Sequence, residues 1–462
     1  MKNWQQPFVM YRLFLCVLAF LLIGSAPVLA QTIAGGIDTI GNRGGVLVDA
    51  NGVLSRFFAK DFGKLSRQQL NAAKASYSIS QDVTAKSPMR CVALNRLEKI
   101  VEANGILTDE MKYLAGIQRI TYVFYFPESK DIVIAGPAEG WFPGYEGAMI
   151  GTGTQQPVCE LQHLVTALRA YAPGGDRTGI VGCSIDPTQE GNARLQQFQA
   201  QAGNMTPRDF VRGVRESLGM QTIRVDGIPA TAHAAQIMVA ADYRMKRIGL
   251  GMDDLRVSGL KTFIANTVPT NRSNALFRWY FVPDYECVVL TEDRNGMELV
   301  GEGVKLVGEN EVVSSTGERT VTEGPLDPGS AAFTKSFTGR YPQIAKQALV
   351  FAQLRNWIDM LICAAHIQRE DFYGKSGWTM TFFGNEEKFS LEICVAPKEV
   401  EPIVGERLMR ELVLAPVGGI AIDAEVALDE EHAKPDTNGK IANKQNQIAL
   451  ALPEDVWWWD AK

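Results

Sequence analysis

Two apolar runs joined by a short polar connection, at 119–126 and 131–141, constrain the fold more than any other part of the chain. The first, Arg119-Ile-Thr-Tyr-Val-Phe-Tyr-Phe126, is rich in aromatic and β-branched residues, and Pro127 stands in the connection. This composition favours strands over helices, and the short connection favours a hairpin. Because both runs are almost wholly apolar, we expect both of their faces to be buried. The chain is therefore expected to fold around a buried β-hairpin.

The second run breaks at Gly136-Pro137 and leads into a loop rich in glycine, proline and aromatic residues. Irregular backbone at the end of a buried strand leaves side chains free to face a ligand. Aromatic faces beside a carboxylate are typical of sugar or peptide recognition, so we predict that the loop lines a concave surface with Trp141 partly exposed. The candidate ligand-binding residues are Glu139, Trp141, Phe142 and Tyr145.

The first thirty residues have the pattern of a secretory signal. Lys2 and Arg12 precede an apolar segment at 13–23, and a small-residue exit ends at Ala30. The apolar segment is too short to anchor the chain in a membrane, and no second segment of spanning length follows it. We expect a soluble protein that is exported to the periplasm or beyond, with cleavage before Gln31.

Charge and cysteine content exclude several classes of protein. The formal net charge of −6 argues against a nucleic-acid protein held by bulk charge, so no nucleic-acid partner is expected. The six cysteines after the signal are too sparse for a disulfide scaffold, and about 15 pairings stay open. They are Cys91, Cys159, Cys183, Cys287, Cys363 and Cys394. None forms a Cys-x-x-Cys pair, so neither a metal site nor a cofactor is expected.

Caps and apolar periodicity divide the rest of the chain into segments. The predicted segments are an N-terminal extension with a short β-hairpin at 31–88, an α/β domain at 89–254, a linker at 255–275, an α+β domain at 276–428, and a polar, flexible tail at 429–462 that ends in a tryptophan cluster. The fold class is thus mixed α/β and α+β. We expect a central mixed sheet with helices in the first domain, and one long buried helix at 342–369 in the second.

Local signals predict several element ends. Asp186 and Thr206 each precede a proline at a first helical position, so each is expected to cap a helix, and Asn295-Gly296 predicts a two-residue hairpin turn. Further strands are expected at 378–383 and 389–395, and a further helix at 399–410. Residues 418–428 match 44–54 at five of eleven positions. A true repeat would place both stretches in similar settings.

Gly182-Cys-Ser-Ile-Asp186 is similar to a nucleophile elbow, in which a sharp turn exposes a serine, here Ser184. The elbow needs a second glycine where this chain has Asp186, so we favour a helix cap over a nucleophile.

Other polar residues allow a functional or a structural interpretation. Four of them share one face of the 342–369 helix: Arg355, Asp359, Cys363 and His366. They suit a thiolate or metal site, but we favour a packed polar network in which Arg355 pairs with Asp359. His163 and His233 have no partner at ligand spacing and are expected to be structural. Two basic clusters are expected to be solvated faces and not sites for an anionic polymer: Arg208, Arg212 and Arg215, and then Arg244, Lys246 and Arg247.

Several strings together resemble an exported bacterial family catalogued only as a domain of unknown function. They are Leu114-Ala-Gly116, Ala135-Gly-Pro-Ala-Glu-Gly-Trp141, Cys183-Ser-Ile-Asp-Pro187, Ala240-Ala-Asp-Tyr-Arg-Met-Lys-Arg-Ile248 and Leu354-Arg-Asn-Trp-Ile-Asp359. The resemblance covers most of the chain after about Arg90. It implies no activity, cofactor or site residue.

Two function classes stay open. We expect a non-catalytic binding protein or a structural protein of the cell envelope, because no residue set has catalytic spacing. The alternative is a hydrolase of envelope glycan or peptide that uses Glu139 with Asp131 or Glu146, or Ser184. An envelope glycan or peptide is the expected partner in either case.

Overall fold

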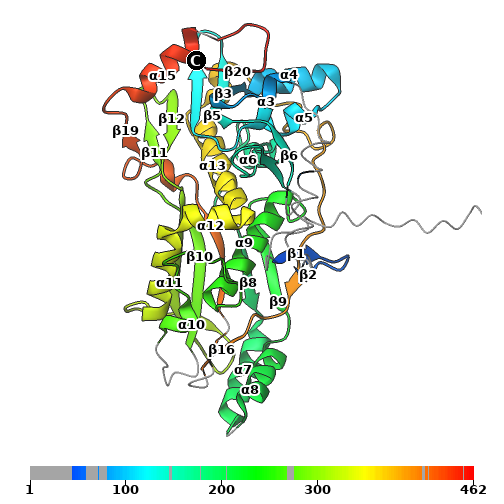
Figure 1. Cartoon of the computed structure of the whole chain (residues 1–462), viewed down its shortest axis with the longest axis vertical. Helices are drawn as coiled ribbons and strands as arrows, with labels where there is room; N and C mark the ends of the chain where they lie inside the picture. Colours follow the sequence, from blue (N-terminus) through cyan, green and yellow to red (C-terminus); the bar gives the residue numbers. More distant parts are fainter. Residues whose placement is uncertain are drawn as a thin grey trace, which may run out of the picture. The chain divides into compact units, whose positions relative to one another are not determined.

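The computed structural model describes residues 44–58, 71, 81–144, 148–176, 178–203, 205–267, 275–407, 412–414, 416–450 and 452–461. All of them belong to one compact unit, Gly35–Lys462. The predicted signal at 1–30 and Tyr145 of the predicted ligand-binding loop lie outside the described residues. Mixed sheets combined with helices give an α+β fold, which confirms the predicted fold class (Figure 1).

The larger sheet of the described residues has nine strands in the order β1-β2-β15-β9-β8-β18-β10-β13-β14. Their bounds are β1 Gly44–Val48, β2 Val53–Phe58, β15 Glu399–Val400, β9 Gln221–Asp226, β8 Val181–Pro187, β18 Val417–Ile422, β10 Ala275–Pro283, β13 Val304–Val313 and β14 Arg319–Val321. The pairs β2–β15 and β10–β18 are parallel and the others antiparallel, so the sheet is mixed. The similar stretches 44–54 and 418–428 have different settings, because β1 is an edge strand of this sheet and β18 lies inside it.

A second sheet has seven described strands in the order β19-β11-β12-β4-β5-β3-β20. Their bounds are β19 Lys434–Pro435, β11 Val288–Leu290, β12 Gly296–Leu299, β4 Tyr122–Phe126, β5 Asp131–Ala138, β3 Ser87–Ala93 and β20 Trp458–Asp460. The predicted hairpin is confirmed, because β4 and β5 are antiparallel with Phe126 opposite Asp131. The hairpin of β11 and β12 is confirmed as well, but the two-residue turn predicted at Asn295-Gly296 is wrong, because Gly296 already begins β12 and the chain turns at 292–295 with Arg294 in the left-handed conformation.

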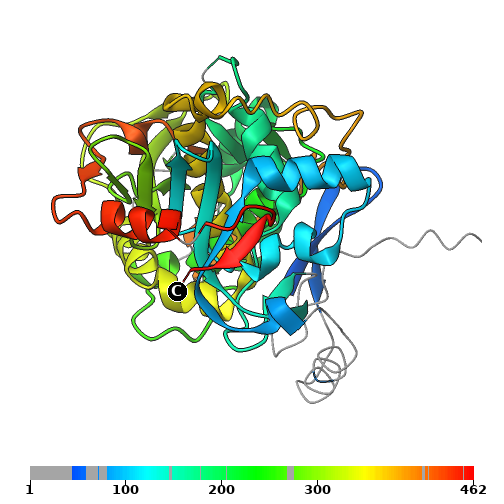
Figure 2. The same ribbon diagram turned by 90° about the horizontal axis from the view of Figure 1, so that it is seen from above.

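Both faces of the β4–β5 hairpin are buried, as its composition predicts. Val123 and Tyr125 face the main core, whereas Tyr122, Phe124 and Phe126 face a second apolar cluster. The second cluster is completed by helix α15, Lys440–Leu450, and by Trp459 of β20, which lies beside β3 (Figure 2). The hairpin is thus covered on each side by apolar side chains that come from distant parts of the chain.

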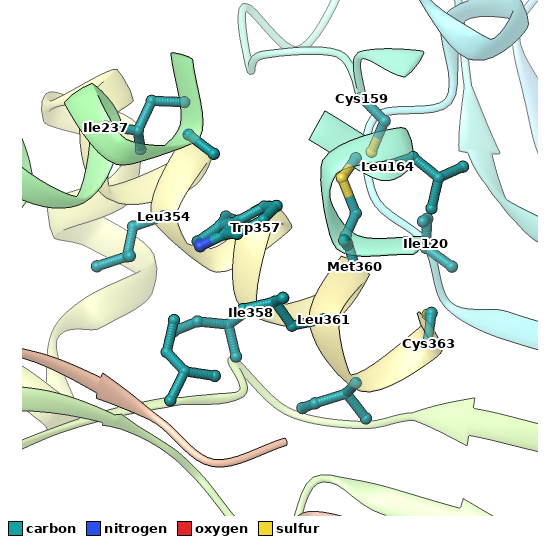
Figure 3. Packing of buried hydrophobic residues seen from close by; sticks show 14 of the residues in the cluster. Ile120, Cys159, Leu164, Ile237, Leu354, Trp357, Ile358, Met360, Leu361 and Cys363 are labelled. Atoms are coloured by element: carbon teal, nitrogen blue, oxygen red, sulfur yellow. The ribbon is translucent and has the colours of Figure 1, made fainter. Parts of the chain in front are cut away.

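Helix α13 is central among the helices, because α6, α9, α12 and α14 pack against it. The bounds of the helices are α3 Gln81–Thr84, α4 Leu94–Asn104, α5 Asp109–Lys112, η1 Leu114–Gly116, α6 Leu161–Ala170, α7 Gln189–Gln201, α8 Pro207–Leu218, α9 His233–Gly249, α10 Phe263–Asn266, α11 Pro328–Gly339, α12 Tyr341–Gln347, α13 Leu349–Arg369, α14 Phe372–Ser376 and η3 Val426–Leu428. Trp357 and Met360 of α13 lie among core side chains that include Leu164 of α6 and Ile237 of α9 (Figure 3). The predicted buried helix is therefore confirmed, although extended backbone at Ala348 separates it from α12.

None of the helices in the described part of the chain is both long enough and apolar enough to span a membrane.

The predicted segments do not correspond to separate sheets. β8 and β9 of the predicted first domain share the larger sheet with β10, β13 and β18 of the second. The smaller sheet likewise combines β3, β4 and β5 with β11 and β12. The segment at 255–275, predicted as a linker, contains α10. Local patterns predict the individual strands, but partners far away in the chain decide which sheet each strand joins.

The tail predicted as flexible instead forms β19, α15 and β20. The tail is mostly polar, but α15 carries two apolar residues seven positions apart, Ile441 and Ile448, and buries both against the smaller sheet. The strands expected at 378–383 and 389–395 are absent from the described chain, where turns and extended coil occupy 377–398. The helix expected from residue 399 is also wrong, because β15 begins there and β16, Gly405–Arg407, follows it. β16 pairs with β17, Leu412–Leu414.

Candidate metal centre

The loop predicted to bind a ligand is buried. Trp141 and Phe142 are each 2% exposed and Glu139 is 3% exposed, so the prediction of a partly exposed Trp141 is wrong. The chain forms a small hairpin here instead of an irregular loop, with β6 at Trp141–Pro143 and β7 at Met149–Gly151. The Trp141 ring packs against Tyr113, 5.9 Å between ring centroids, and so closes the core.

Glu139 anchors the turn that follows β7. Its Oε1 atom accepts hydrogen bonds from the backbone N–H groups of Gly153 and Thr154, at 3.1 and 2.8 Å, and from Gln118 at 2.9 Å. Burial by itself would raise the pKa of Glu139, but these hydrogen bonds outweigh burial and leave the pKa below its ordinary value. A general acid in glycoside hydrolysis needs a raised pKa instead.

The partners considered for Glu139 do not reach it. Asp131 begins β5 and Glu139 follows its end, so the two carboxylates lie about 26 Å apart at ~3.3 Å per residue. Asp131 is paired instead with Arg96 at 2.6 Å. Glu146 lies outside the described residues. The geometry of the described carboxylates therefore gives no hydrolytic pair around Glu139.

Ser184 lies inside strand β8 opposite Arg224 and Gly419, and not on a strand-to-helix elbow. The predicted cap at Asp186 is wrong, because Thr188 caps α7 by accepting a hydrogen bond from the Gly191 N–H. Asp186 still belongs to β8 and forms an ion pair with Arg319 at 2.6 Å. The cap predicted at Thr206 is confirmed.

The polar face of α13 forms a network, but its pairs differ from those predicted. Asp359 binds Arg119 at 2.6 Å, and Arg355 binds Glu302 at 2.8 Å. Cys363 is fully buried, and burial raises the pKa of its thiol well above the ordinary value. A thiol held neutral in this way is neither a nucleophile nor a ready metal ligand.

One of the two basic clusters predicted to be solvated is buried instead. Arg244, Lys246 and Arg247 of α9 are buried, and the first two pair with Asp253 at 3.1 Å and Asp242 at 2.9 Å. The apolar period of α9 predicts one buried face, but the helix is buried almost all round, so its charges are neutralised inside the protein. In the other cluster, Arg208, Arg212 and Arg215 of α8 are exposed.

The structure brings together two histidines for which the sequence indicates no partner. His163 lies in the first turn of α6, and His233 is the first residue of α9. Glu160 directly precedes α6 and does not cap it through its side chain, so its carboxylate is directed elsewhere. Each of the three residues offers one ligand atom, and these atoms all lie within 4.8 Å of one another. This Glu160–His163–His233 cluster is the candidate metal centre.

The two imidazoles are in direct contact. The Nε2 atom of His163 and the Nδ1 atom of His233 lie 2.9 Å apart, a hydrogen bond that needs one donor and one acceptor. The Oε2 atom of Glu160 lies 3.9 Å from the first nitrogen and 4.0 Å from the second. Oε2 also accepts a hydrogen bond from Gln162 at 2.6 Å.

His163 is in the protonation state that a metal needs. Burial lowers the pKa of His163 to about 4, with Glu160 opposing this shift and His233 adding to it. The His163 ring is therefore neutral at neutral pH, and a neutral imidazole is the form that binds metals. One carboxylate and two imidazoles form a donor set that suits Zn²⁺ and similar divalent ions.

The distances nearly fit a metal ion. Two ligand atoms at ~2.1 Å from a tetrahedral zinc lie about 3.4 Å apart. The His163–His233 contact would have to open by about 0.5 Å, and each contact to Glu160 would have to close by a similar amount. His233 retains 29% of its side-chain exposure, so one side of the cluster is open to solvent.

A cavity of about 400 Å³ adjoins the cluster. Its lining includes Thr231 and Ala232, which directly precede His233, and Thr166, which lies one turn after His163. The opposite wall is the segment 390–393, which carries the exposed carboxylate of Glu392. The cavity therefore borders the chain segments that carry His163 and His233, although none of the three candidate ligands lines it.

Part of this centre has a local sequence signal. Glu160 and His163 are three residues apart at a helix start, a spacing that places both on one face. His233 lies 70 residues further along the chain, and no local pattern connects it to the other two.

The part of the chain that resembles a known family begins after Glu160 and His163. The segment at 183–263 runs from β8 to the start of α10 and includes His233, but neither Glu160 nor His163. No curated protein and no solved structure matches the chain. Residues 183–263 match the family model described as "Protein of unknown function (DUF1598)".

Proposed function

We propose that this protein is an exported, non-catalytic binding protein whose ligand is a divalent transition-metal ion of the Zn²⁺ class. The observation that carries the proposal is the convergence of Glu160, His163 and His233 within 4.8 Å from two separate helices. Structural histidines usually donate to a carbonyl or to water, whereas here two rings share one hydrogen bond beside a carboxylate.

The surroundings favour a metal over a proton as the resident cation. An additional proton on His163 is disfavoured by burial, which lowers its pKa. A divalent ion would instead bond to both ring nitrogens and to the Glu160 carboxylate, and would lose only part of its hydration shell. The site therefore discriminates by coordination and not by charge alone.

A hydrolase of envelope glycan or peptide is the second candidate. It would use the Glu160–His163–His233 cluster and not Glu139 or Ser184, the residues that the sequence suggests. Three protein ligands leave one position of a tetrahedral zinc for water, as in catalytic zinc sites. The cavity of about 400 Å³, which Thr231 and Ala232 line just before His233, has room for part of a substrate. Whether a fourth protein ligand fills that position separates the two candidates.

Zinc titration tests the proposed function. We expect the purified, metal-free protein to bind one Zn²⁺ per chain, measured by competition with a chromophoric chelator. His233→Ala should weaken binding by at least about 100-fold, because even changes in residues that only support a ligand cost 10- to 100-fold. His233 is the preferred position because it is partly exposed, so its replacement disturbs the core least.

His432→Ala is the matched control, since His432 stacks beside Tyr285 at 5.6 Å on another part of the protein. Its zinc affinity should equal that of the unaltered protein. Equal affinity of the His233→Ala variant, or a loss caused by His432→Ala instead, would refute the proposed function. Far-UV circular dichroism of each metal-free variant checks that the fold is intact.

A further inference from the structure

Two adjoining cavities lie between helix α8, the end of helix α9 and the segment 401–405. Their volumes are about 450 and 400 Å³, and Arg215, Met252 and Val404 line both of them. The segment is held against α8, because Val404 packs into the apolar cluster that includes Val214 of that helix. Since they share these walls, the two cavities are two halves of one candidate site.

Three arginines contribute to the walls of this site. Arg208 and Arg215 are two turns apart on α8 and so share one face of the helix. Arg247 of α9 lines the larger cavity, is only 8% exposed, and donates a hydrogen bond to the Met252 carbonyl at 3.2 Å. Glu401 is the carboxylate in the lining. With three arginines against one carboxylate, the lining is positively charged at neutral pH.

The two arginines of α8 are available to a ligand. Asp209 and Glu216 are close to them in sequence, but both carboxylates pair with Arg212, at 2.7 and 3.9 Å. Neither Arg208 nor Arg215 forms a side-chain hydrogen bond or an ion pair with any residue that the structure describes. A guanidinium group without a protein carboxylate is well suited to bind the anionic group of a ligand.

The rest of the lining is largely apolar. Val211 lies between the two arginines on α8, and Leu250 and Met252 directly follow α9. The segment 401–405 contributes Ile403 and Val404. Sites for small organic ligands typically combine such apolar walls with a few charged groups that fix the orientation of the ligand. The site is therefore suited to an anion that carries an apolar part.

We propose that the two cavities bind a small organic phosphate. Arg215, which lines both cavities, is the central contact of the phosphate group, and Arg208 and Arg247 flank it, one in each cavity. A phosphate monoester carries nearly two negative charges at neutral pH, so it can pair with more than one arginine, whereas a carboxylate carries a single charge. The apolar part of the ligand lies against Val211 and Val404.

This site is separate from the candidate metal centre. His233 is the first residue of α9, and Arg247 lies 14 residues after it, which is about 21 Å along the helix. Neither cavity of the phosphate site is lined by Glu160, His163 or His233. The two proposals can therefore fail independently of each other.

Isothermal titration calorimetry with 1-naphthyl phosphate tests this inference. The metal-free protein is used, so that the phosphate cannot bind through an ion at the candidate metal centre. We expect one 1-naphthyl phosphate per chain. Inorganic phosphate, which lacks the apolar part, and 1-naphthol, which lacks the charge, should each bind at least about 10-fold more weakly.

Arginine variants identify the binding groups. Arg215→Gln should weaken the binding of 1-naphthyl phosphate by at least about 10-fold, the loss expected when a hydrogen bond to a charged group is removed. Arg212→Gln is the matched control, because Arg212 lies on the same helix but is paired with Asp209. Its affinity should equal that of the unaltered protein. Both side chains are exposed, so neither change disturbs the core, and far-UV circular dichroism checks the fold.

Four results would overturn the inference. The first is the absence of 1-naphthyl phosphate binding to the folded, unaltered protein. An equal loss in Arg212→Gln would mean that bulk charge attracts the anion. Inorganic phosphate that binds as tightly as the ester would show that no organic part is recognised. A loss in His233→Ala as large as that in Arg215→Gln would show that the two sites are not separate.

Discussion

The pH dependence of stability follows from one buried histidine, His366. Its side chain is fully buried within α13, and its ring packs edge-on against Phe372, with 5.2 Å between ring centroids. Burial lowers the pKa of His366 to about 3, and the neighbouring charges of Arg294, Lys375 and Arg369 act in the same direction. The folded protein therefore holds this ring neutral over the whole range in which a histidine normally gains its proton.

The size of the effect follows from proton linkage. The pKa of histidine in an unfolded chain is about 6.5, so the unfolded state binds a proton more readily than the folded state. A lowered folded pKa means that stability is fully present above about pH 6.5 and is lost as the pH falls from there toward about 3. At pH 5 the loss is about 2 kcal/mol, since each pH unit below 6.5 costs ~1.36 kcal/mol.

His366→Leu removes this proton and keeps an apolar side chain of similar size. Urea unfolding at about pH 7.5 and about pH 5 gives the free energy of unfolding for both proteins. We expect the unaltered protein to lose about 2 kcal/mol more than the variant between the two pH values. The comparison cancels contributions from His163 and other titrating groups that both proteins share. Equal losses in the two proteins would refute the account of His366 as a buried neutral ring.

Two further substitutions test the interior. Trp141→Ala should cost about 3 to 5 kcal/mol in the free energy of unfolding, because this 2%-exposed ring closes the core against Tyr113, and a loss below about 1 kcal/mol would instead support a ligand-facing loop. Lys246→Met should cost a similar 3 to 5 kcal/mol or so, because it leaves the buried Asp242 carboxyl without its partner at 2.9 Å. The double variant Asp242→Leu/Lys246→Met should recover most of that loss in the same unfolding assay, and a double variant as unstable as the single one would contradict the pairing.

Local patterns predicted those elements whose cause is local. Burial of both faces of β4 and β5 follows from their own apolar side chains. The hairpin of β11 and β12 follows from the nearby turn signal, although the turn itself lies at 292–295. The Thr206 cap likewise depends only on the next three residues. Such signals place strands and helices correctly, because the interactions that decide them lie within a few residues.

Distant partners decided what local patterns could not. Asp186 has every local feature of a helix cap, yet Arg319, which lies 133 residues further along the chain, pairs with it, and Thr188 becomes the cap. Arg355 and Asp359 have the spacing of an ion pair, yet each finds a partner on another element. In both cases the competing charge is invisible in the local sequence.

The candidate metal centre was missed for the same physical reason. Glu160 and His163 have a readable helical spacing, but two ligands do not define a site. His233 reaches them only because α9 packs beside α6 in the folded protein. Conversely, aromatic and carboxylate composition predicted a ligand surface at Glu139 and Trp141, where the side chains are in fact buried.

The most direct test of the metal centre is an anomalous-difference map at the zinc absorption edge, from crystals of the protein grown with Zn²⁺. We expect a peak at about 2.0 to 2.1 Å from Nε2 of His163 and from Nδ1 of His233, with the Glu160 carboxylate as the third ligand. An intact hydrogen bond between the two rings, with no peak between them at saturating zinc, would contradict it.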